Sequence, residues 1–330
     1  MTQITQTTER SRQPLPKKKG LDILKGIAIL GVFFYHLLPS IFPGGFLGVP
    51  LFFVLSGYLM YLTAVPYLEE GSFPVFSYYK KRIHRLVPPL FYMVMIICCV
   101  MTLTRSRQMI GIREQILSIF LGYNNWWQIK QDASYFTRLT GASPFTHLWF
   151  LGVEMQFYLI WPFLFFLYKK LRQRLGGARA CYFFLALALL SLTVMIVLYH
   201  PGGNPTRVYY GTDTIGFTLC LGMFLGALRH DHPSLHLSIS GHLQTPVYVC
   251  MIGIIILLYI WINGNCRFLY LGGMFLISLF FALIILYIED HRSVPLKLPL
   301  AGPTALLGKY SYYIYLWHYP VIVLLLAAFH

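Results

Sequence analysis

The sequence is poor in charged residues. Only 11% of its 330 residues are Asp, Glu, Lys or Arg, and 57% are hydrophobic, whereas ordinary soluble domains carry about 25% charged residues. This composition excludes a soluble globular protein. The alternating segments of about ten residues that mark a transmembrane β-barrel are also absent, while apolar runs of about 18 residues, long enough to cross a bilayer, recur along the chain.

Acidic residues are especially scarce, with 11 Asp and Glu against 26 Lys and Arg, a net charge of +15. The positions of the cations argue against a nucleic-acid partner. Eighteen of the 26 lie in five segments that face the cytoplasm if the N-terminus is inside, seven lie on the other side, and Lys25 lies within a span. The positive-inside rule therefore predicts a cytoplasmic N-terminus. The five segments are 1–20, 66–85, 169–180, 229–244 and 289–309.

Paired cysteine motifs are lacking too. The six cysteines form no C-x-x-C pair, and five of them lie in apolar runs, where small-hydrophobe packing is their usual role. We therefore expect neither a disulfide framework nor a metal site. The first apolar run has no convincing small-residue cleavage site, so we expect it to be retained as a span. No internal repeat of the kind common in secondary transporters is visible.

What the sequence does contain is a series of apolar helices. We predict an all-α polytopic transmembrane bundle of about nine to eleven spans. Residues 1–20 are predicted to be a disordered basic cytoplasmic tail, and residues 21–330 a single transmembrane domain. The nine visible spans are 21–38, 46–65, 86–104, 147–168, 181–199, 212–228, 246–262, 268–288 and 306–328. Residues 105–146 form either an extracellular loop with an interfacial helix or a short re-entrant pair.

The chain is organised around a helical hairpin, Leu21–Met60, that carries two polar residues in its first helix. Lys25 and His36 are eleven residues apart and so share a helix face. Lys25 is either functional or a cation that snorkels to the headgroups. His36 is expensive to keep in a span, and a histidine can accept the proton of a hydroxyl near neutral pH. We predict that His36 is a general base.

Two further groups of polar residues lie at or inside spans. Arg82 and Arg85, in KKRIHR, face the same way and suit a phosphate ligand, although an ordinary positive-inside anchor has the same composition. Glu154 lies about two turns into a span, one turn before Tyr158, and we expect it to orient or charge-stabilise a histidine. His147, seven residues earlier on the same face, lies at the interface, where histidine needs no functional explanation.

Tyrosines gather near the expected outer side. Tyr209, Tyr210 and Asp213 in RVYYGTDT could line an outward cavity. In SYYIYLWHYP, Tyr315 and His318 fall on one helix face. Interfacial tyrosines are more often simple belt residues, and that interpretation stays open here.

Taken together, five motifs resemble the acyltransferase-3 family of integral membrane O-acyltransferases, in order and across nearly the whole chain. Within the family the chain looks most like the peptidoglycan O-acetyltransferases of Gram-positive bacteria. The motifs are GGFLGVPLFFVLSGYL, KKRIHRLVPP, HLWFLGVEMQFYLIWP, YYGTDT and KYSYYIYLWHYPV.

The resemblance implies an acyl group, usually acetyl, taken from cytoplasmic acetyl-CoA and passed to a sugar hydroxyl outside. Acetyl-CoA is then a substrate, with no tightly bound cofactor. The partners are the lipid bilayer and an extracellular glycan, reached in some members through an SGNH-type esterase-like domain, and the location is the plasma membrane. The resemblance implies donor binding by Lys25, Arg82 and Arg85, catalysis by His36 and Glu154, and an acyl relay or positioning role for Tyr209 or Tyr210.

The chain also departs from the family pattern. Lys25 stands where arginine is usual, which keeps the charge but loses the bidentate fork, and the family's further helix with a glutamate–proline motif is not in the sequence. Three alternatives therefore remain: acetylation of another surface polysaccharide, a transporter without covalent chemistry, and an inactive scaffold. The other substituted positions are Pro50, Phe150, Met155 and Ile215.

Overall fold

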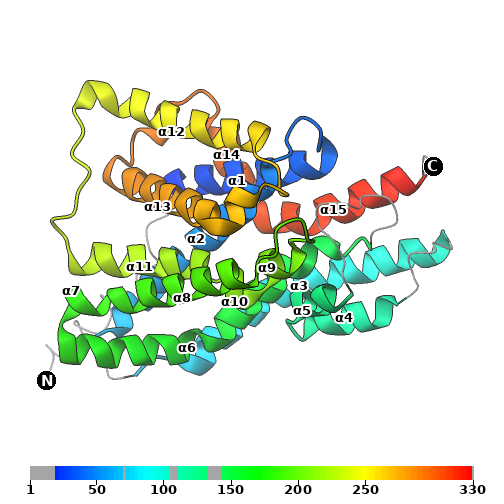
Figure 1. Cartoon of the computed structure of the whole chain (residues 1–330), viewed down its shortest axis with the longest axis horizontal. Helices are drawn as coiled ribbons and strands as arrows, with labels where there is room; N and C mark the ends of the chain where they lie inside the picture. The colour runs from blue at the N-terminus through cyan, green and yellow to red at the C-terminus, as the bar shows by residue number, and fades with distance from the viewer. Residues whose placement is uncertain (1–18, 70–71, 105–110, 132–142, 329–330) are drawn as a thin grey trace, which may run out of the picture.

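The computed structural model describes residues 19–69, 72–104, 111–131 and 143–328. Its long helices run roughly along the long axis of the molecule (Figure 1). Seven of them are long and apolar enough to cross a membrane, and the residues described contain no β-strand, so the predicted all-α polytopic class is confirmed. The seven are α1 (Lys19–Leu37), α2 (Gly48–Ala64), α3 (Val75–Leu103), α6 (Trp149–Leu175), α8 (Tyr182–Leu198), α12 (Gly241–Trp261) and α13 (Met274–Asp290).

Two shorter helices account for the other predicted spans. The first is α11 (Phe217–Asp231), and the second is α15 (Ser311–Ala328). The last predicted span began too early, at residue 306. A separate helix, α14 (Ala301–Lys309), precedes α15, and the helices are interrupted at Tyr310.

The predicted loop before the third span is also wrong in part. The KKRIHR segment lies inside α3, which begins at Val75 and continues through Pro88 and Pro89. Hydropathy places the end of a span at its first charges, but lysine and arginine are good helix formers. The helix therefore continues into the polar region and carries Arg82 and Arg85 on a rigid element.

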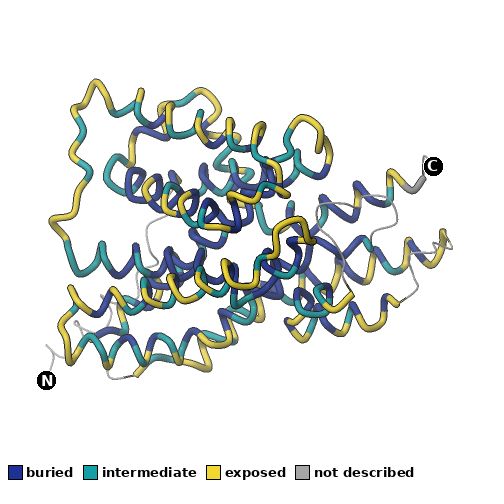
Figure 2. Tube along the Cα trace, in the orientation of Figure 1, coloured by how far each residue is buried: buried dark blue, intermediate teal, exposed yellow. Residues whose placement is uncertain are grey.

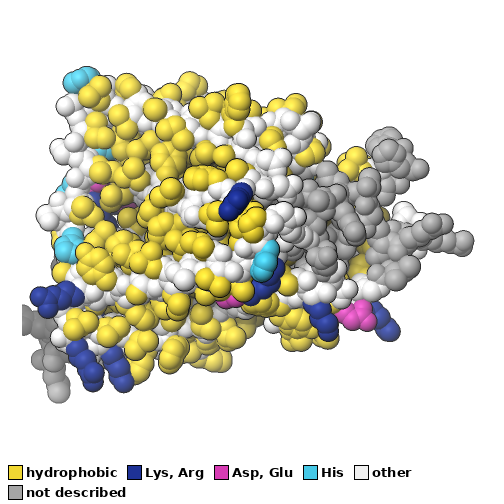
Figure 3. All heavy atoms as spheres, viewed as in Figure 1, with side chains coloured by type: hydrophobic (Ala, Val, Ile, Leu, Met, Phe, Trp, Pro, Cys, Tyr) yellow, Lys and Arg dark blue, Asp and Glu magenta, His cyan; other side chains and the backbone are white. Residues whose placement is uncertain are grey.

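The hairpin partner α2 lies at the centre of the bundle. It is the most buried of the long helices, whereas α8 and α12 are mostly exposed, and Figure 2 shows this contrast between a buried centre and an exposed periphery. The exposed side chains on α8 and α12 are largely apolar, with Val197 and Trp261 among the most exposed. Hydrophobic side chains cover the middle of the molecule in Figure 3, as expected for a surface that contacts lipid.

The first helix is held against α14 by reciprocal close approach at two glycines. A Cβ on Gly308 would lie 1.7 Å from the carbonyl oxygen of Asp22, and one on Gly26 would lie 2.1 Å from that of Thr304. No side chain fits at either distance, so the two backbones pack directly on one another. This packing fixes the part of α1 that carries Lys25.

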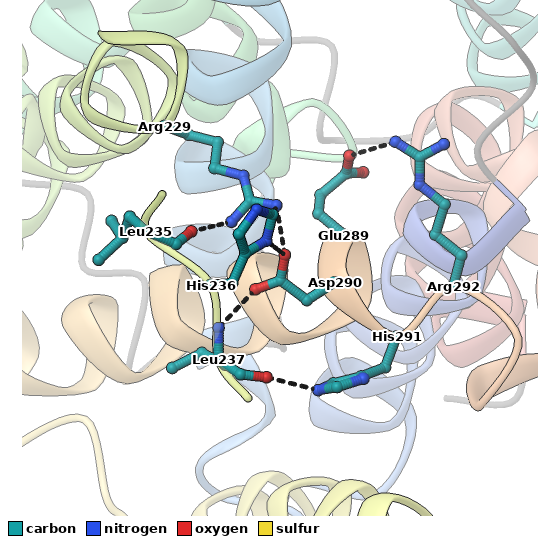
Figure 4. A network of polar contacts seen from close by, with 8 residues as sticks. All are labelled: Arg229, Leu235, His236, Leu237, Glu289, Asp290, His291 and Arg292. Carbon is teal, nitrogen blue, oxygen red and sulfur yellow. Dashed lines mark hydrogen bonds and ion pairs between the residues drawn. The ribbon is translucent and has the colours of Figure 1, made fainter. Parts of the chain in front are cut away.

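Ion pairs join three helices near their C-terminal ends. Arg172 of α6 donates to Asp231 of α11, with Nη2 to Oδ1 at 2.7 Å. Arg229 of α11 pairs with Asp290 of α13, and Asp290 also accepts the backbone N–H of Leu237 at 2.9 Å (Figure 4). These ends belong to segments predicted to face the cytoplasm, so the contacts fasten the bundle on that side.

Four short helices pack at the other end of the long helices. They are α4 (Ile112–Phe120), α5 (Asn124–Lys130), α9 (Thr206–Tyr210) and α10 (Thr212–Ile215). Gln156 of α6 joins them, because it accepts from Thr212 at 2.6 Å and donates to Asn125 at 2.9 Å. Of the predicted 105–146 loop, residues 105–110 and 132–142 lie outside the described residues, as does most of the 1–20 tail.

Candidate active site

A cavity of about 210 Å³ opens between α1, α2, α3, α6 and α15. It brings together four of the predicted site residues, Lys25, Arg82, Arg85 and Glu154. Ser56 of α2 also lines it. Three cations and one carboxylate leave the cavity with a net positive charge, which suits an anionic ligand.

Lys25 is held at the cavity by a residue of its own helix. Its Nζ lies 3.0 Å from Oδ1 of Asp22, one turn earlier, and both side chains are about a quarter exposed. The lysine thus lines the cavity, where the sequence alone left snorkelling open. Its neighbour Asp22 partly offsets its charge.

Glu154 is fixed on the cavity side by two donors. Ser56 Oγ and the Tyr158 hydroxyl each donate to Oε1 at 2.7 Å. The guanidinium of Arg82 lies over the ring of the same tyrosine, 4.5 Å from its centroid. Tyr158 therefore links the carboxylate to the arginine, with a hydrogen bond to one and a cation–π contact to the other.

The support of His36 by Glu154 stays a prediction. The hydrogen bonds of Glu154 described above are with Ser56 and Tyr158 of the cavity, whereas His318 of α15 is one of the residues whose rings contact His36. The distance from His318 Nε2 to His36 Nδ1 is 3.2 Å. The sequence marks both polar positions but not the contact between His36 and His318, because which helix faces α1 depends on packing.

A third histidine completes a buried cluster. His147, in the 3-10 turn Thr146–Leu148 before α6, lies with its ring 5.4 Å from that of His318. Tyr319 contacts both His36 and His147, at ring distances of 4.7 and 5.2 Å. All three histidines are at most 5% exposed. We define His36, His147 and His318 as the histidine cluster.

Tyr315 and Phe150 stand between the cavity and the histidine cluster. Both line the cavity, and their rings are 5.1 Å apart. The hydroxyl of Tyr315 donates to the backbone carbonyl of His147, and its ring lies 5.6 Å from that of His318. A single layer of side chains therefore separates the cationic cavity from the histidines.

Tyr209 and Tyr210 lie against Trp149, two residues after His147. Both are fully buried, so the predicted outward cavity lined by them is wrong. Tyr209 donates to the carbonyl of Phe46 at 3.1 Å, and Trp149 stacks on Tyr210 at 4.5 Å. Burial raises the pKa of both phenols well above the ordinary value, so they are neutral near pH 7 and would need a base to act as nucleophiles.

Asp213, the third residue of the predicted outer group, lies elsewhere. It forms a two-point ion pair with Arg207, at 3.0 and 2.6 Å, and both side chains are 36% exposed. The guanidinium of Arg207 also lies 5.0 Å from the ring centroid of Trp126. This pair fastens α5 and α9 to α10 and leaves Asp213 apart from the tyrosines.

Sequence reasoning undervalued several residues that the structure brings into or beside the site. His147 and His318 are visible in the sequence, but each also fits an interfacial position; nothing in the sequence marks Ser56. The signal that could have raised them is their number, because three histidines in apolar segments are costly. For Ser56, a lone hydroxyl in an apolar helix gives no such signal.

The chain is similar to known proteins over nearly its whole length. A family model described as an acyltransferase domain matches residues 18–329. The peptidoglycan O-acetyltransferase OatA of Listeria monocytogenes is 34% identical over 327 residues, covering 97% of this chain and 51% of its own length. A Bacillus subtilis protein named "Putative peptidoglycan O-acetyltransferase YrhL" is 36% identical over 310 residues, covering 92% and 48%. The chain thus spans about half the length of these curated relatives, and no solved structure matches it.

Proposed function

Because the chain belongs to the acyltransferase-3 family, we propose that it is a multi-pass O-acetyltransferase of the plasma membrane. It takes an acetyl group from cytoplasmic acetyl-CoA and delivers it to a hydroxyl of a cell-wall glycan, with peptidoglycan as the acceptor. The observation that carries the proposal is the arrangement of the site: a cationic cavity is separated by one layer of side chains from three buried histidines.

The cationic cavity suits the acyl donor. Its volume of about 210 Å³ is below the range of about 300–1,000 Å³ usual for drug-sized ligands, so it accepts the narrow thioester arm and leaves the nucleotide outside. A surface hollow beside it is lined by Ser77, Lys80, Lys81, His84 and Arg85. Arg85 lines both spaces, so phosphates bound in the hollow would lie next to the mouth of the cavity.

The chemistry is an acyl transfer with His36 as general base. The acceptor oxygen attacks the thioester carbonyl while its proton passes to His36, and the carbon–sulfur bond then breaks. The CoA sulfur leaves and takes the proton from the imidazolium, so that no charge or proton is left over. Either the glycan hydroxyl or the phenol of Tyr209 or Tyr210 serves as the first acceptor, and a tyrosine would pass the acetyl group outward.

The orientation follows from the charges. With the N-terminus inside, the ends of α6, α11 and α13 and the basic segment of α3 face the cytoplasm, where acetyl-CoA is made available. The acceptor then lies beyond Tyr209 and Tyr210. An SGNH-type esterase-like domain or protein on that side would complete delivery to the wall.

The proposal is tested with the purified chain in liposomes and acetyl-CoA labelled in its acetyl group. We expect release of CoA and appearance of label in added soluble peptidoglycan fragments. Proton flux without cleavage of acetyl-CoA would instead identify a transporter. Transfer to another surface polysaccharide, with none to peptidoglycan fragments, would correct the acceptor but keep the reaction.

A further inference from the structure

The contacts of His318 define the hydrogen-bonding state of its ring. Its Nδ1 lies 2.8 Å from the carbonyl oxygen of Tyr315 and 3.2 Å from that of Ile314. Carbonyl oxygens only accept hydrogen bonds, so Nδ1 carries the hydrogen. In the neutral ring Nε2 is then an acceptor, and this is the atom that faces His36.

The contacts of His36 lead to a matching conclusion. Its Nδ1 lies 2.8 Å from the carbonyl oxygen of Val32, four residues earlier in α1, and 3.2 Å from His318 Nε2. Both neighbours accept, so Nδ1 of His36 also carries the hydrogen. The basic lone pair of a neutral His36 is therefore on Nε2.

We propose that His318 is a positioning residue for His36: together with the carbonyl of Val32 it holds the tautomer in which Nε2 is basic, and it takes up part of the positive charge. This inference rests on the proposed acyl transfer. When the acceptor hydroxyl gives its proton to His36 Nε2, the hydrogen on His36 Nδ1 shifts towards His318 Nε2. The carbonyl of Val32 is too weak a base to accept this hydrogen. The proton returns along the same path when the CoA sulfur leaves.

A neutral imidazole suits this place better than a carboxylate. Serine hydrolases use an aspartate to orient their histidine, but an anion buried between membrane helices is costly. The ionisable groups that face the two rings are Tyr35 on α1, His147 before α6, and Tyr315 and Tyr319 on α15. These groups are tyrosines and a histidine and include no carboxylate, lysine or arginine, so the pair works without a buried fixed charge.

The kinetic test replaces His318 by methionine, which removes the acceptor, and by glutamine, whose amide oxygen can take the place of Nε2. We expect His318→Met to lower kcat about 100-fold, the low end of what a positioned base supplies, with an unchanged KM for acetyl-CoA. His318→Gln should recover about tenfold of this loss, because it restores the hydrogen bond but not the second base. The matched control is His242→Gln, at an exposed histidine of α12.

A spectroscopic test does not depend on the variants or on activity. In wild-type protein labelled with ¹⁵N histidine, we expect the neutral His36 signal to be that of the Nδ1–H tautomer. An Nε2–H tautomer, or equal kcat in His318→Met and wild type, would overturn the proposal. Failure of the wild type to cleave acetyl-CoA would instead refute the proposed function, since the tautomer would still be observed.

Discussion

Arg82 lies over the ring of Tyr158, with its guanidinium carbon 4.5 Å from the ring centroid. The hydroxyl of the same tyrosine donates to Glu154 at 2.7 Å. One side chain thus contacts a cation and an anion at the wall of the cavity. A second ring, that of Tyr78, also lies near the guanidinium of Arg82, with its centroid 5.4 Å from the guanidinium carbon.

Removing only the hydroxyl of Tyr158 tests its link between Arg82 and Glu154. Tyr158→Phe keeps the ring beneath Arg82 but deletes one donor to Glu154, and a hydrogen bond to a charged group contributes about 1.5–3 kcal/mol. We expect a lower kcat/KM for acetyl-CoA, and a larger loss in Tyr158→Leu, which also removes the cation–π contact. The control is Tyr182→Phe, at an exposed tyrosine. Equal activity in all three variants would refute the role given to Tyr158.

Donor binding is tested with two ligands that differ by one phosphate. Arg85→Ala and the pair Lys80→Ala with Lys81→Ala should each weaken binding of CoA, by an amount that shrinks at high salt because the sites are exposed. The wild type should bind dephospho-CoA, which lacks the 3′-phosphate, less tightly than CoA. A variant that lacks the side chain contacting this phosphate should bind dephospho-CoA as tightly as the wild type does. Binding measured by calorimetry in detergent gives both values. Identical losses with the two ligands would place the 3′-phosphate elsewhere.

The packing of α1 on α14 predicts a sharp contrast between two glycines of the same helix. Gly308→Ala would place a methyl group 1.7 Å from the carbonyl oxygen of Asp22, whereas Gly302 has open space around it. We expect Gly308→Ala to lower both Tm and the affinity for acetyl-CoA. Gly302→Ala should leave Tm unchanged or raise it, since alanine favours helix over glycine by about 1 kcal/mol. Similar Tm values for both variants would contradict the close approach.

The ion pair at the end of α13 is expected to be structural. Asp290 is 4% exposed and accepts from Arg229 and from the backbone of Leu237. Asp290→Asn should therefore destabilise the protein, towards the about 3–5 kcal/mol that breaking a buried pair costs. Arg174→Gln changes an exposed arginine of α6 and should have little effect, as surface substitutions usually do. Thermal unfolding in detergent measures both, and an unchanged Tm in Asp290→Asn would show that the pair contributes nothing.

The fold was largely predictable from the sequence, because membrane spans depend on local hydrophobicity. The nine apolar runs all form helices. The errors occur where hydropathy changes while helix propensity does not, as at Val75–Arg85, and where a short helix precedes a span, as at α14. Both boundaries carry a local signal that hydropathy outweighed: Pro74 directly precedes Val75 at the start of α3, and Gly308 lies two residues before the interruption at Tyr310.

The site was predictable only residue by residue. Lys25, Arg82, Arg85 and Glu154 were each recognised from the cost of placing charge in or beside a span, and they do line one cavity. The partner of His36 was not recognised, because His318 is 282 residues away and its ring reaches His36 only through the packing of α15 on α1. The burial of Tyr209 and Tyr210 likewise depends on Phe46 and Trp149, from two other parts of the chain.

The central claim is that His36 acts on an acetyl group that enters through the cationic cavity. The most direct measurement compares wild type and His36→Ala in liposomes, for binding of acetyl-CoA and for transfer of its labelled acetyl group. The account predicts that the variant binds acetyl-CoA with wild-type affinity and transfers no acetyl. Full transfer by His36→Ala would contradict it.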